Sequence, residues 1–559
     1  MRSAILAILF AASLDARVTR LAIENRQPGG AGYERLSGHV YGELDPHDPL
    51  NAIITDLGSA PRNARGMVEY FATFVIAKPA DMSKASGLLF YQVPNRGNGN
   101  VIESRGDVSV ISGWQGDLTP RNGLQTITVP IAKGLTGPAL VRFYNMPAGT
   151  NTLPMGAGIG DPVLRPAPVT LDTAKATLTR RASETTAVTP IASSDWAFAD
   201  CTKAAFPGLP DPSKVCLKGG FDPQYLYELA YTAKDPLVLG IGYAATRDLN
   251  SFLRYDTSVA NPVAGKIKFA IAAGTSQSGN FLRSLLHLGF NQDETGRIVF
   301  DGMNTNIAAR QNPMNFRFAV PGGAANLYEP GSEAVVWWSD YEDTVRHRPA
   351  AGLRDRCNAT QTCPKIVETF GSSEFWGLRM SPDLVGTDAK ADIPLPPNVR
   401  RYYNPGVTHG GGRGGFKLES PARGCLLPDN PNPASDTVRA ITAALIDWVM
   451  NGTLPPPSRY PRLDRGELVP ATSAAMGFPL IPGWPTPDNM VNTVLVYDFG
   501  PEFNYNDLSG LITIQPPIVK GIVPTLVPRV NQDGNETSGI PSVLHQAPLG
   551  TYLGWNVTA

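Results

Sequence analysis

The chain has 559 residues, of which 42% are hydrophobic and 17% charged, and its formal net charge at pH 7 is -1. This balance, with no block of like charge, argues against nucleic acid or an anionic membrane surface as a partner. Glycine and proline make up nearly a fifth of the chain and imply many turns, but the hydrophobic fraction is that of a globular protein rather than of a disordered one.

The first residues indicate export. One arginine precedes an apolar run from Ala4 to Leu14, and Ala16 follows at a plausible cleavage point. This run is too short to span a bilayer, so we predict a signal peptide over residues 1–16 rather than an anchor. An ordinary N-terminal strand or helix is the alternative. We expect a secreted or periplasmic protein with no membrane contact after signal removal.

Export determines how the cysteines are interpreted. Cys201 lies close in sequence to Cys216, Cys357 lies close to Cys363, and Cys425 is left over. We predict two short-loop disulfides from these pairs, each worth roughly 2 to 3 kcal/mol in the loop-entropy model. Five reduced structural cysteines are the alternative. No spacing of cysteine and histidine suggests zinc, so no metal is expected.

The first part of the chain is rich in strand-like runs. Residues 17–119 contain "RVTRLAIE", "GHVYGEL", "NAIITDL", "GMVEYFATFVIAKP" and "GLLFYQVP", and the last is apolar enough to lie inside a sheet. Residues 120–222 carry short strand candidates in a Pro-rich and Ser/Thr-rich context. We predict a β-rich insertion there, stapled by the first disulfide, and a role in binding a polymer is one hypothesis for it.

Strands and helices then alternate over residues 223–454. The hydrophobic spacing predicts helices over 237–255, 281–288 and 436–450, and strands over 267–271, 297–300, 365–370 and 399–403. Such alternation predicts the α/β class, with a mostly parallel central sheet covered by helices on both faces. Residues 455–559 are Pro-rich and are expected to pack on this core as loops and short strands.

The stretch "GTSQSG", residues 274–279, joins a buried strand to an amphipathic helix. Gly-x-Ser-x-small at such a junction is typical of a nucleophile elbow, where the strained serine needs small residues two positions before and after it. Ser276 has Gly274 and Ser278 at these positions. Ser278 would have Ser276 and the larger Asn280, so we favour Ser276 as the nucleophile.

The elbow also predicts part of an oxyanion hole. The backbone N–H of Gln277 would lie at the positive end of the following helix. A second N–H is expected from the Gly-rich loop in "LLFYQVPNRGNGN", at Arg96 or Gly97. A plain turn is the rival interpretation of that loop.

A nucleophilic serine needs a base that an acid holds in place, in the chain order Ser, acid, His. Among the later histidines His287, His347, His409 and His545, only His409 follows a predicted strand, in "YYNPGVTHGGGRGG". Its glycine run lacks the spacing of a phosphate-binding loop.

For the acid, Glu374 ends the strand "KIVETFGSSEFW", and Asp301 after "RIVF" is the alternative. A carboxylate at either place could also cap a helix. Trp114 and Trp376 are candidates to line a substrate pocket, although a core role is common for tryptophan.

The segments "GELDPHDPLNAIITDLGSAPRNARGMVEY", "SGWQGDL", "YELAYTAKDPLVLGIGYAATRDLNSFLRY", "GTSQSGNFLRSLLHLGF", "SSEFWG" and "VTHGGG" resemble a family of exported bacterial alpha/beta hydrolase domain proteins. An arginine often replaces Asn280 in that family. The resemblance implies an α/β-hydrolase fold in which Ser276 is the nucleophile, Glu374 the acid and His409 the base.

The motif and the resemblance together favour a secreted serine hydrolase that cleaves carboxylic esters through an acyl-enzyme, without a cofactor. Its substrate would be a small-molecule or polymer-attached ester. An amidase or peptidase with the same triad, and a binding protein on a hydrolase scaffold, are the alternatives.

Overall fold

The computed structural model describes residues 17–30, 32–156, 163–321, 334–417, 420–421 and 424–558. The expected signal peptide, residues 1–16, lies outside the described residues. Within the described ranges, none of the helices is both long enough and apolar enough to cross a bilayer.

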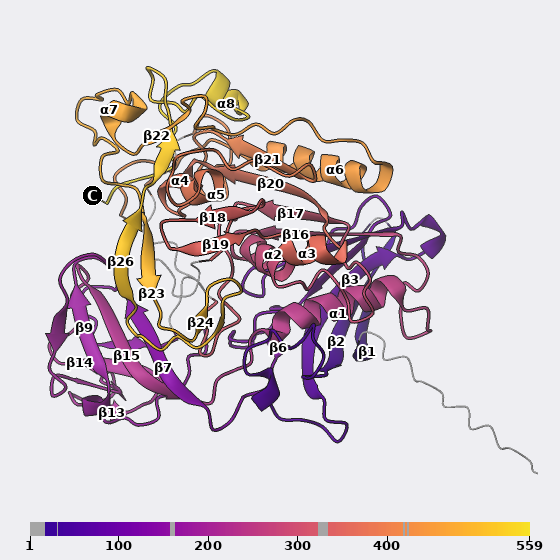
Figure 1. Ribbon diagram of the computed structural model, residues 1–559, viewed down its shortest axis with the longest axis horizontal. Coiled ribbons are helices and arrows are strands. Elements are labelled where there is room, and N and C mark those ends of the chain that lie inside the picture. Colours follow the sequence, from indigo (N-terminus) through magenta and orange to yellow (C-terminus); the bar gives the residue numbers. More distant parts are fainter. Residues whose placement is uncertain are drawn as a thin grey trace, which may run out of the picture.

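A large β-sheet runs through the middle of the molecule (Figure 1). Across it the strands lie in the order β1 (Val18–Pro28), β2 (Tyr33–Leu44), β3 (Val68–Pro79), β5 (Val108–Ser112), β4 (Leu88–Gln92), β16 (Phe269–Thr275), β17 (Gly302–Asn306), β20 (Lys365–Gly371) and β21 (Val399–Asn404). The short β6 (Ile127–Thr128) also pairs with β3. Pairs from β1 to β5 are antiparallel, and pairs from β5 through β4 to β21 are parallel. The sheet is therefore mixed, rather than mostly parallel as the sequence suggested.

Its parallel strands are covered on both faces. In β4, Leu89 and Tyr91 belong to the largest hydrophobic cluster, whereas Leu88 and Phe90 belong to a second cluster on the other face. This division follows from the alternation of side chains along a strand. Helices α1 (Ile241–Tyr255) and α2 (Gln277–His287) contribute to the first cluster, and α6 (Ser435–Asn451) contributes to the second. Figure 1 shows α6 on the opposite side of the sheet from α1 and α2.

The predicted helices and strands largely form, but α1 begins later than residue 237. Backbone hydrogen bonds from Ala132 N to Pro236 O and from Val238 N to Pro130 O hold this segment to an earlier turn. The strand expected over 297–300 is absent from its predicted place. Asn291 binds both the N–H and the C=O of Phe300 through its side chain, so the chain loops there and β17 starts only at Gly302.

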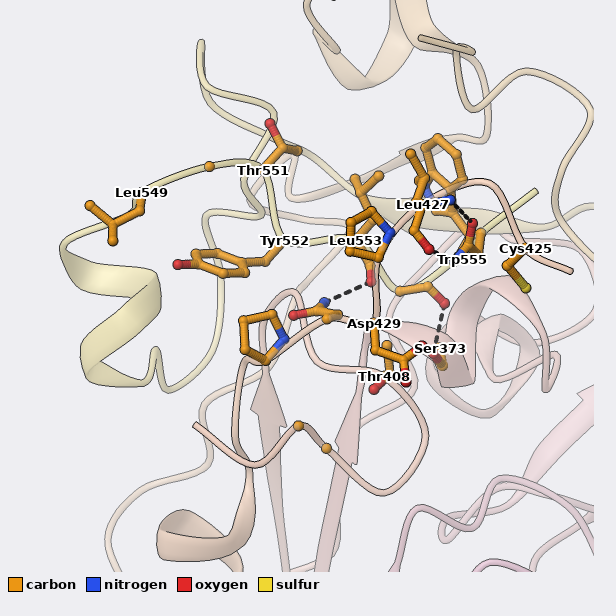
Figure 2. Close-up of a pocket in the computed structure, with 18 of the residues that line it drawn as sticks. Ser373, Thr408, Cys425, Leu427, Asp429, Leu549, Thr551, Tyr552, Leu553 and Trp555 are labelled. Atoms are coloured by element: carbon orange, nitrogen blue, oxygen red, sulfur yellow. Dashed lines mark hydrogen bonds between the residues drawn. The ribbon is translucent and has the colours of Figure 1, made fainter. Parts of the chain in front are cut away.

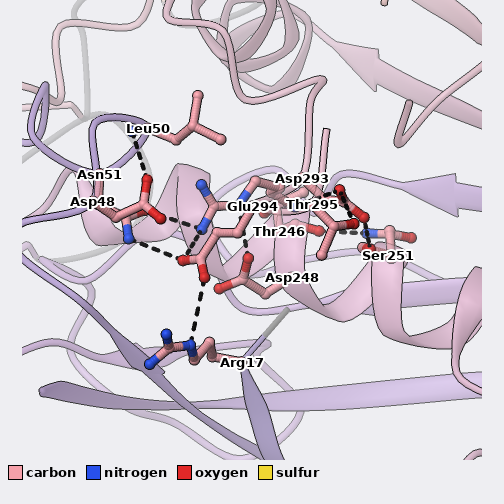
Figure 3. Close-up of polar contacts among 12 residues, drawn as sticks. Arg17, Asp48, Leu50, Asn51, Thr246, Asp248, Ser251, Asp293, Glu294 and Thr295 are labelled. Carbon is pink, nitrogen blue, oxygen red and sulfur yellow. Dashed lines mark hydrogen bonds and ion pairs between the residues drawn. The ribbon is translucent and has the colours of Figure 1, made fainter. Parts of the chain in front are cut away.

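The strand expected in "NAIITDL" is also wrong, because this segment forms turns. Asp48 accepts a hydrogen bond from Leu50 N, a turn that competes with extended structure. The Asn51 side chain is buried and donates to Glu294, which also accepts from Arg247 of α1 and lies 3.6 Å from Arg17. Figure 3 shows this polar network joining Arg17, which directly precedes β1, to the turn and to α1.

A second, smaller β-rich unit lies beside the core, at the lower left of Figure 1. Its main sheet has the order β10 (Thr189–Ile191), β9 (Thr177–Arg181), β15 (Leu226–Lys234) and β7 (Thr136–Phe143). The insertion expected over 120–222 therefore continues through β15, which the sequence boundary had given to the core. Smaller sheets contain β8 (Thr152–Pro154), β11 (Trp196–Ala197), β14 (Lys214–Leu217), β12 (Ala199–Asp200) and β13 (Leu209–Pro210).

Both expected cysteine pairs are bonded in the structure. Cys201 and Cys216 have Cα atoms 5.8 Å apart, and Cys357 and Cys363 have Cα atoms 4.7 Å apart. Cys425 is the only free cysteine among the described residues. The first disulfide cross-links the β-rich unit. The second links Cys357, in the short helix α3 (Asp355–Thr360), to Cys363 just after it.

The C-terminal region consists of short strands and loops that pack on the core. It contains the strand pairs β22 (Leu468–Pro470) with β27 (Leu526–Pro528), β23 (Val494–Asp498) with β26 (Ile518–Val523), and β24 (Phe503–Asn504) with β25 (Ser509–Gly510). Tyr497 of β23 donates a hydrogen bond to Glu184 of the β-rich unit, so this region connects the two parts. The remaining elements are β18 (Tyr341–Asp343), β19 (Arg348–Ala351), α4 (Ser372–Trp376), α5 (Ser381–Val385), α7 (Ser473–Met476), α8 (Val543–Gln546) and 3₁₀ turns η1 (Leu57–Ser59), η2 (Met82–Lys84) and η3 (Thr173–Lys175).

Candidate active site

Ser276 occupies a sharp turn between β16 and α2. Its backbone angles are φ 58° and ψ -120°, a conformation that a side chain other than glycine rarely adopts and that costs free energy. A side chain at Gly274 would lie 2.3 Å from the carbonyl oxygen of Ser278, and one at Gly279 would lie 2.6 Å from the Cβ of Ala308. The close approach predicted for a nucleophile elbow is therefore present around Ser276.

Ser278 has a different environment. It lies in the first turn of α2 with no exposed surface, whereas Ser276 is partly exposed. Of the two serines in "GTSQSG", the structure presents Ser276 to solvent.

His409 joins Ser276 to Glu374. Its Nε2 lies 2.8 Å from Ser276 Oγ, and its Nδ1 lies 2.6 Å from Glu374 Oε1. His409 follows β21, and Glu374 lies in α4 directly after β20, so all three residues come from the carboxyl ends of parallel strands. Glu374 is fully buried, and its Oε2 accepts a hydrogen bond from Gly371 N at 2.5 Å. The carboxylate is thus fixed on the histidine.

Asp301, the alternative acid, lies elsewhere. Because β17 begins at Gly302, Asp301 stands before this strand rather than at its carboxyl end. Its carboxylate lies 2.9 Å from Arg254 and accepts a hydrogen bond from Ala270 N. The other late histidines are also elsewhere: His347 is exposed, and burial lowers the pKa of His287 to about 4 while its Nε2 contacts Asn506 O. His545 is partly buried on α8, which lowers its pKa.

The residues predicted for the oxyanion hole lie at the same edge of the sheet as Ser276. Gln277 is the first residue of α2, so its N–H lies at the end of the helix that favours negative charge. Arg96 and Gly97 lie in the loop after β4, with φ angles of 48° and 77°. Since β4 pairs in parallel with β16, this loop and the elbow lie at the same edge of the sheet. Asn95 Nδ2 donates to Thr275 O at 3.1 Å and ties the loop to the elbow.

Trp114, a candidate for the substrate pocket, is instead buried in the core. Its ring is 1% exposed and packs against Phe281 of α2, with centroids 4.4 Å apart. Its Nε1 donates to Pro94 O at 2.7 Å, at the start of the predicted oxyanion loop. The motif "SGWQGDL" therefore supports this loop from inside the protein.

Gln115 is a residue that the sequence reasoning missed. Its Oε1 accepts a hydrogen bond from the Gln277 side chain at 3.2 Å, and its Nε2 donates to Asp117 at 2.8 Å. Gln277 Nε2 also donates to Pro321 O. Burial raises the pKa of Asp117 to about 6. The only sequence signal was its place in "SGWQGDL", directly after the buried strand β5.

A cavity of about 1030 Å³ adjoins His409 (Figure 2). It is lined by the loop that follows His409 and by the C-terminal segment up to Asn556. Trp376 does not line it. Trp376 is 3% exposed and lies behind Trp555, which does face the cavity, with ring centroids 6.1 Å apart. Trp376 belongs with Phe375 to a hydrophobic cluster beneath α4, and this packing turns its ring away from the cavity.

A buried ionic cluster connects the elements that carry the three residues. Arg283 of α2 and Arg401 of β21 each contact both Glu368 of β20 and Asp383 of α5. The two arginine contacts with Asp383 are each 3.0 Å. None of the four side chains is more than 1% exposed. Burial raises the pKa of Asp383 to about 6, and the two arginines oppose this effect.

Metal ligands are not clustered in the described part of the chain: no three His, Cys, Asp or Glu side chains there are close enough together to hold an ion. No curated protein and no solved structure matches the chain. A family model described as an alpha/beta hydrolase domain matches residues 173–559, a segment that contains Ser276, Glu374 and His409. With this match over more than half of its length, the chain belongs to the alpha/beta hydrolase domain family.

Proposed function

We propose that this hydrolase cleaves carboxylic esters with Ser276 as nucleophile, His409 as general base and Glu374 as the acid that orients the histidine. The observation that carries the proposal is the continuous chain of contacts from Ser276 Oγ through His409 to Glu374. A serine hydroxyl is a weak nucleophile at neutral pH, and a hydrogen-bonded imidazole with a fixed carboxylate partner is the arrangement that activates it.

In the first step, Ser276 Oγ attacks the ester carbonyl carbon while His409 Nε2 removes the hydroxyl proton. The carbonyl oxygen becomes an oxyanion, which the N–H of Gln277 and an N–H of the Arg96–Gly97 loop would stabilise. The tetrahedral intermediate then expels the alcohol oxygen, to which His409 returns the proton. Water repeats the sequence on the acyl-enzyme and releases the carboxylic acid, so that neither a cofactor nor a metal enters the reaction.

The ester assignment is tested with a matched pair of chromogenic substrates. We expect the purified protein to hydrolyse p-nitrophenyl acetate and to leave 4-nitroacetanilide intact over the same period, as measured by release of nitrophenolate and nitroaniline. Faster hydrolysis of the anilide would replace the esterase assignment with an amidase. Failure of both reactions, together with no labelling by a fluorophosphonate, would favour a binding protein on a hydrolase scaffold.

Gln115 provides a test of the oxyanion part of the mechanism. Replacing it with leucine removes the hydrogen bond to the Gln277 side chain while keeping a similar volume. We expect kcat for p-nitrophenyl acetate to fall by about tenfold, because the Gln277 N–H would be displaced and would stabilise the oxyanion of the transition state less well. KM should change little, since this N–H does not act on the bound substrate before the reaction. Initial rates over a range of substrate concentrations measure both constants.

The same change at Gln292, on the turn after α2, is the control, because its side chain makes a long hydrogen bond to Gly296 O, at 3.5 Å, and lies far along the chain from the elbow. Gln292→Leu should keep the kcat of the unmodified protein. A rise in KM without loss of kcat in Gln115→Leu, or an equal loss in both variants, would contradict a positioning role for Gln115.

We also propose that the protein is secreted or periplasmic, acting on a small-molecule or polymer-attached ester. Its two short-loop disulfides are of the kind that persist in an oxidising compartment. Thiol titration of the native protein from its host should then find one free cysteine. Cytosolic recovery with all five thiols reduced would contradict export.

A further inference from the structure

The cavity beside His409 is formed by segments that are far apart in sequence. Its walls come from the loop over residues 408–417, from residues 425–431, from residues 478–485 and from the C-terminal residues 549–556. In Figure 2, Tyr552, Leu553 and Trp555 of the C-terminal segment lie across from Ser373 and Thr408. The cavity volume of about 1030 Å³ is at the upper end of the range for sites that bind small molecules.

Hydrogen bonds hold these walls together. Leu426 N donates to Val557 O at 2.7 Å, and Leu427 N donates to Asn556 Oδ1 at 3.0 Å. Asn430 Nδ2 donates to Gly406 O and to Leu553 O, each at 2.8 Å. These bonds tie residues 425–431 to the C-terminal segment, so that the two form one continuous wall of the cavity.

The largest side chains of the lining are aromatic. Phe416, Phe478, Trp484, Tyr552 and Trp555 all line the cavity, and Phe478 packs on Trp555 with centroids 6.2 Å apart. Phe416 is 76% exposed and Trp484 is 46% exposed, so large apolar surface remains uncovered there. Such surface favours an apolar, preferably aromatic, occupant.

The charged lining residues stand at the solvent side. Arg413, Lys417 and Asp429 line the cavity but are exposed, so they keep contact with water. No charge is buried inside among the described lining residues, and a charged group on the ligand would lose its hydration without gaining a buried partner.

The position of the cavity relative to the triad indicates which part of an ester would enter it. His409 and Ser373, the neighbour of Glu374, line it, but no lining residue belongs to the elbow over 274–280 or to the oxyanion loop over 94–100. In the proposed mechanism the alcohol oxygen leaves next to His409 Nε2, whereas the carbonyl oxygen faces Gln277. The group bonded to the alcohol oxygen is therefore the one that extends on the histidine side.

We infer that this cavity binds the alcohol part of the ester, and that the substrates are esters of large apolar or aromatic alcohols. This inference rests on the proposed function. It assigns a binding role to the C-terminal segment, whose aromatic residues form one wall, and to Phe416 and Trp484 at the rim.

Two isomeric esters compare the effect of an aromatic ring on the alcohol side with its effect on the acyl side. Benzyl acetate carries its ring on the alcohol, methyl phenylacetate carries it on the acyl group, and their alcohols are similarly poor leaving groups. We expect kcat/KM, measured by titration of released acid, to favour benzyl acetate by at least about tenfold, the discrimination typical of an apolar pocket. Equal values, or a preference for methyl phenylacetate, would overturn the inference.

Trp484→Ala removes an exposed ring from the cavity rim and should reduce the ratio of the two kcat/KM values by about fivefold or more. Phe71→Ala is the matched control, because Phe71 is a 39% exposed aromatic residue on β3 outside the cavity. The control should keep the unmodified ratio. An unchanged ratio in Trp484→Ala, or an equal change in both variants, would contradict an alcohol site here.

Labelling by a fluorophosphonate distinguishes a failure of this inference from a failure of the proposed function. If the label reacts at Ser276 and both esters are hydrolysed without discrimination, the triad stands and the alcohol site is wrong. If no label reacts and neither ester is hydrolysed, the proposed function itself fails, and the inference fails with it.

Discussion

Replacing Ser276 with alanine is expected to lower kcat for p-nitrophenyl acetate by on the order of 10⁶-fold, because the variant has no oxygen to form the acyl-enzyme. The loss should fall on kcat, since substrate binding does not need the hydroxyl. The substitution removes one atom from a partly exposed side chain, so the folded structure should persist. Initial rates, with circular dichroism to check the fold, measure the effect.

Ser278→Ala is the control for this experiment. Ser278 stands two residues away and is fully buried in the first turn of α2, without the contact to His409 that Ser276 makes. We expect its kcat to remain within about threefold of the unmodified protein, as for a substitution without a role in the chemistry. A greater loss in Ser278→Ala than in Ser276→Ala would show that Ser278, and not Ser276, is the nucleophile.

Replacing Arg401 with methionine is expected to lower the free energy of unfolding by about 3 to 5 kcal/mol, the cost of breaking a buried charge network. Arg401 contacts Glu368 and, at 3.0 Å, Asp383, and none of these side chains is more than 1% exposed. Without it, two buried carboxylates would share the single guanidinium of Arg283. Urea denaturation followed by fluorescence measures the free energy of unfolding.

Arg439→Met is the matched control, the same substitution at an ion pair on the surface of α6. Arg439 and Asp436 are 79% and 80% exposed, so water and salt screen their attraction. This variant should unfold at the same urea concentration as the unmodified protein. A similar loss of stability in both variants, or none in either, would contradict a structural role for the buried cluster.

The elbow was the part of the site most open to prediction from sequence. Its requirement for small neighbours is local, so Gly274 and Ser278 sufficed to favour Ser276, and the turn has the expected backbone geometry. The positions of Glu374 and His409 followed from the ends of two strands whose apolar runs were easily recognised. Their meeting at one edge of the sheet is a consequence of parallel pairing. Their catalytic roles remain predictions that the experiments above test.

Asp301 shows why the alternative acid could not be rejected from sequence. The run "RIVF" has the apolar character of a strand, and a strand there would end at Asp301. The side chain of Asn291 captures both backbone groups of Phe300 instead, and the strand starts two residues later. A hydrogen bond between residues in a loop has no periodicity, so hydrophobic spacing does not reveal it.

The tryptophans were misplaced for a related reason. Trp114 and Trp376 stand next to polar or catalytic candidates, and sequence proximity suggested that they shared the pocket. The direction of a side chain depends on its place in an element, and both rings point into the core. Trp555, near the end of the chain, lines the cavity instead. The strand β15 was missed because its partners, β7 and β9, come from the β-rich unit, and only that pairing makes it a strand.

The most direct test of the proposed chemistry is to locate the adduct of a fluorophosphonate probe on the native protein by peptide mass spectrometry. We expect one adduct per chain, on Ser276. The adduct should be absent after His409→Ala, because the hydroxyl attacks the probe only when the imidazole, 2.8 Å away, accepts its proton. An adduct on Ser278 or another residue, or undiminished labelling of Ser276 without the imidazole, would contradict the account.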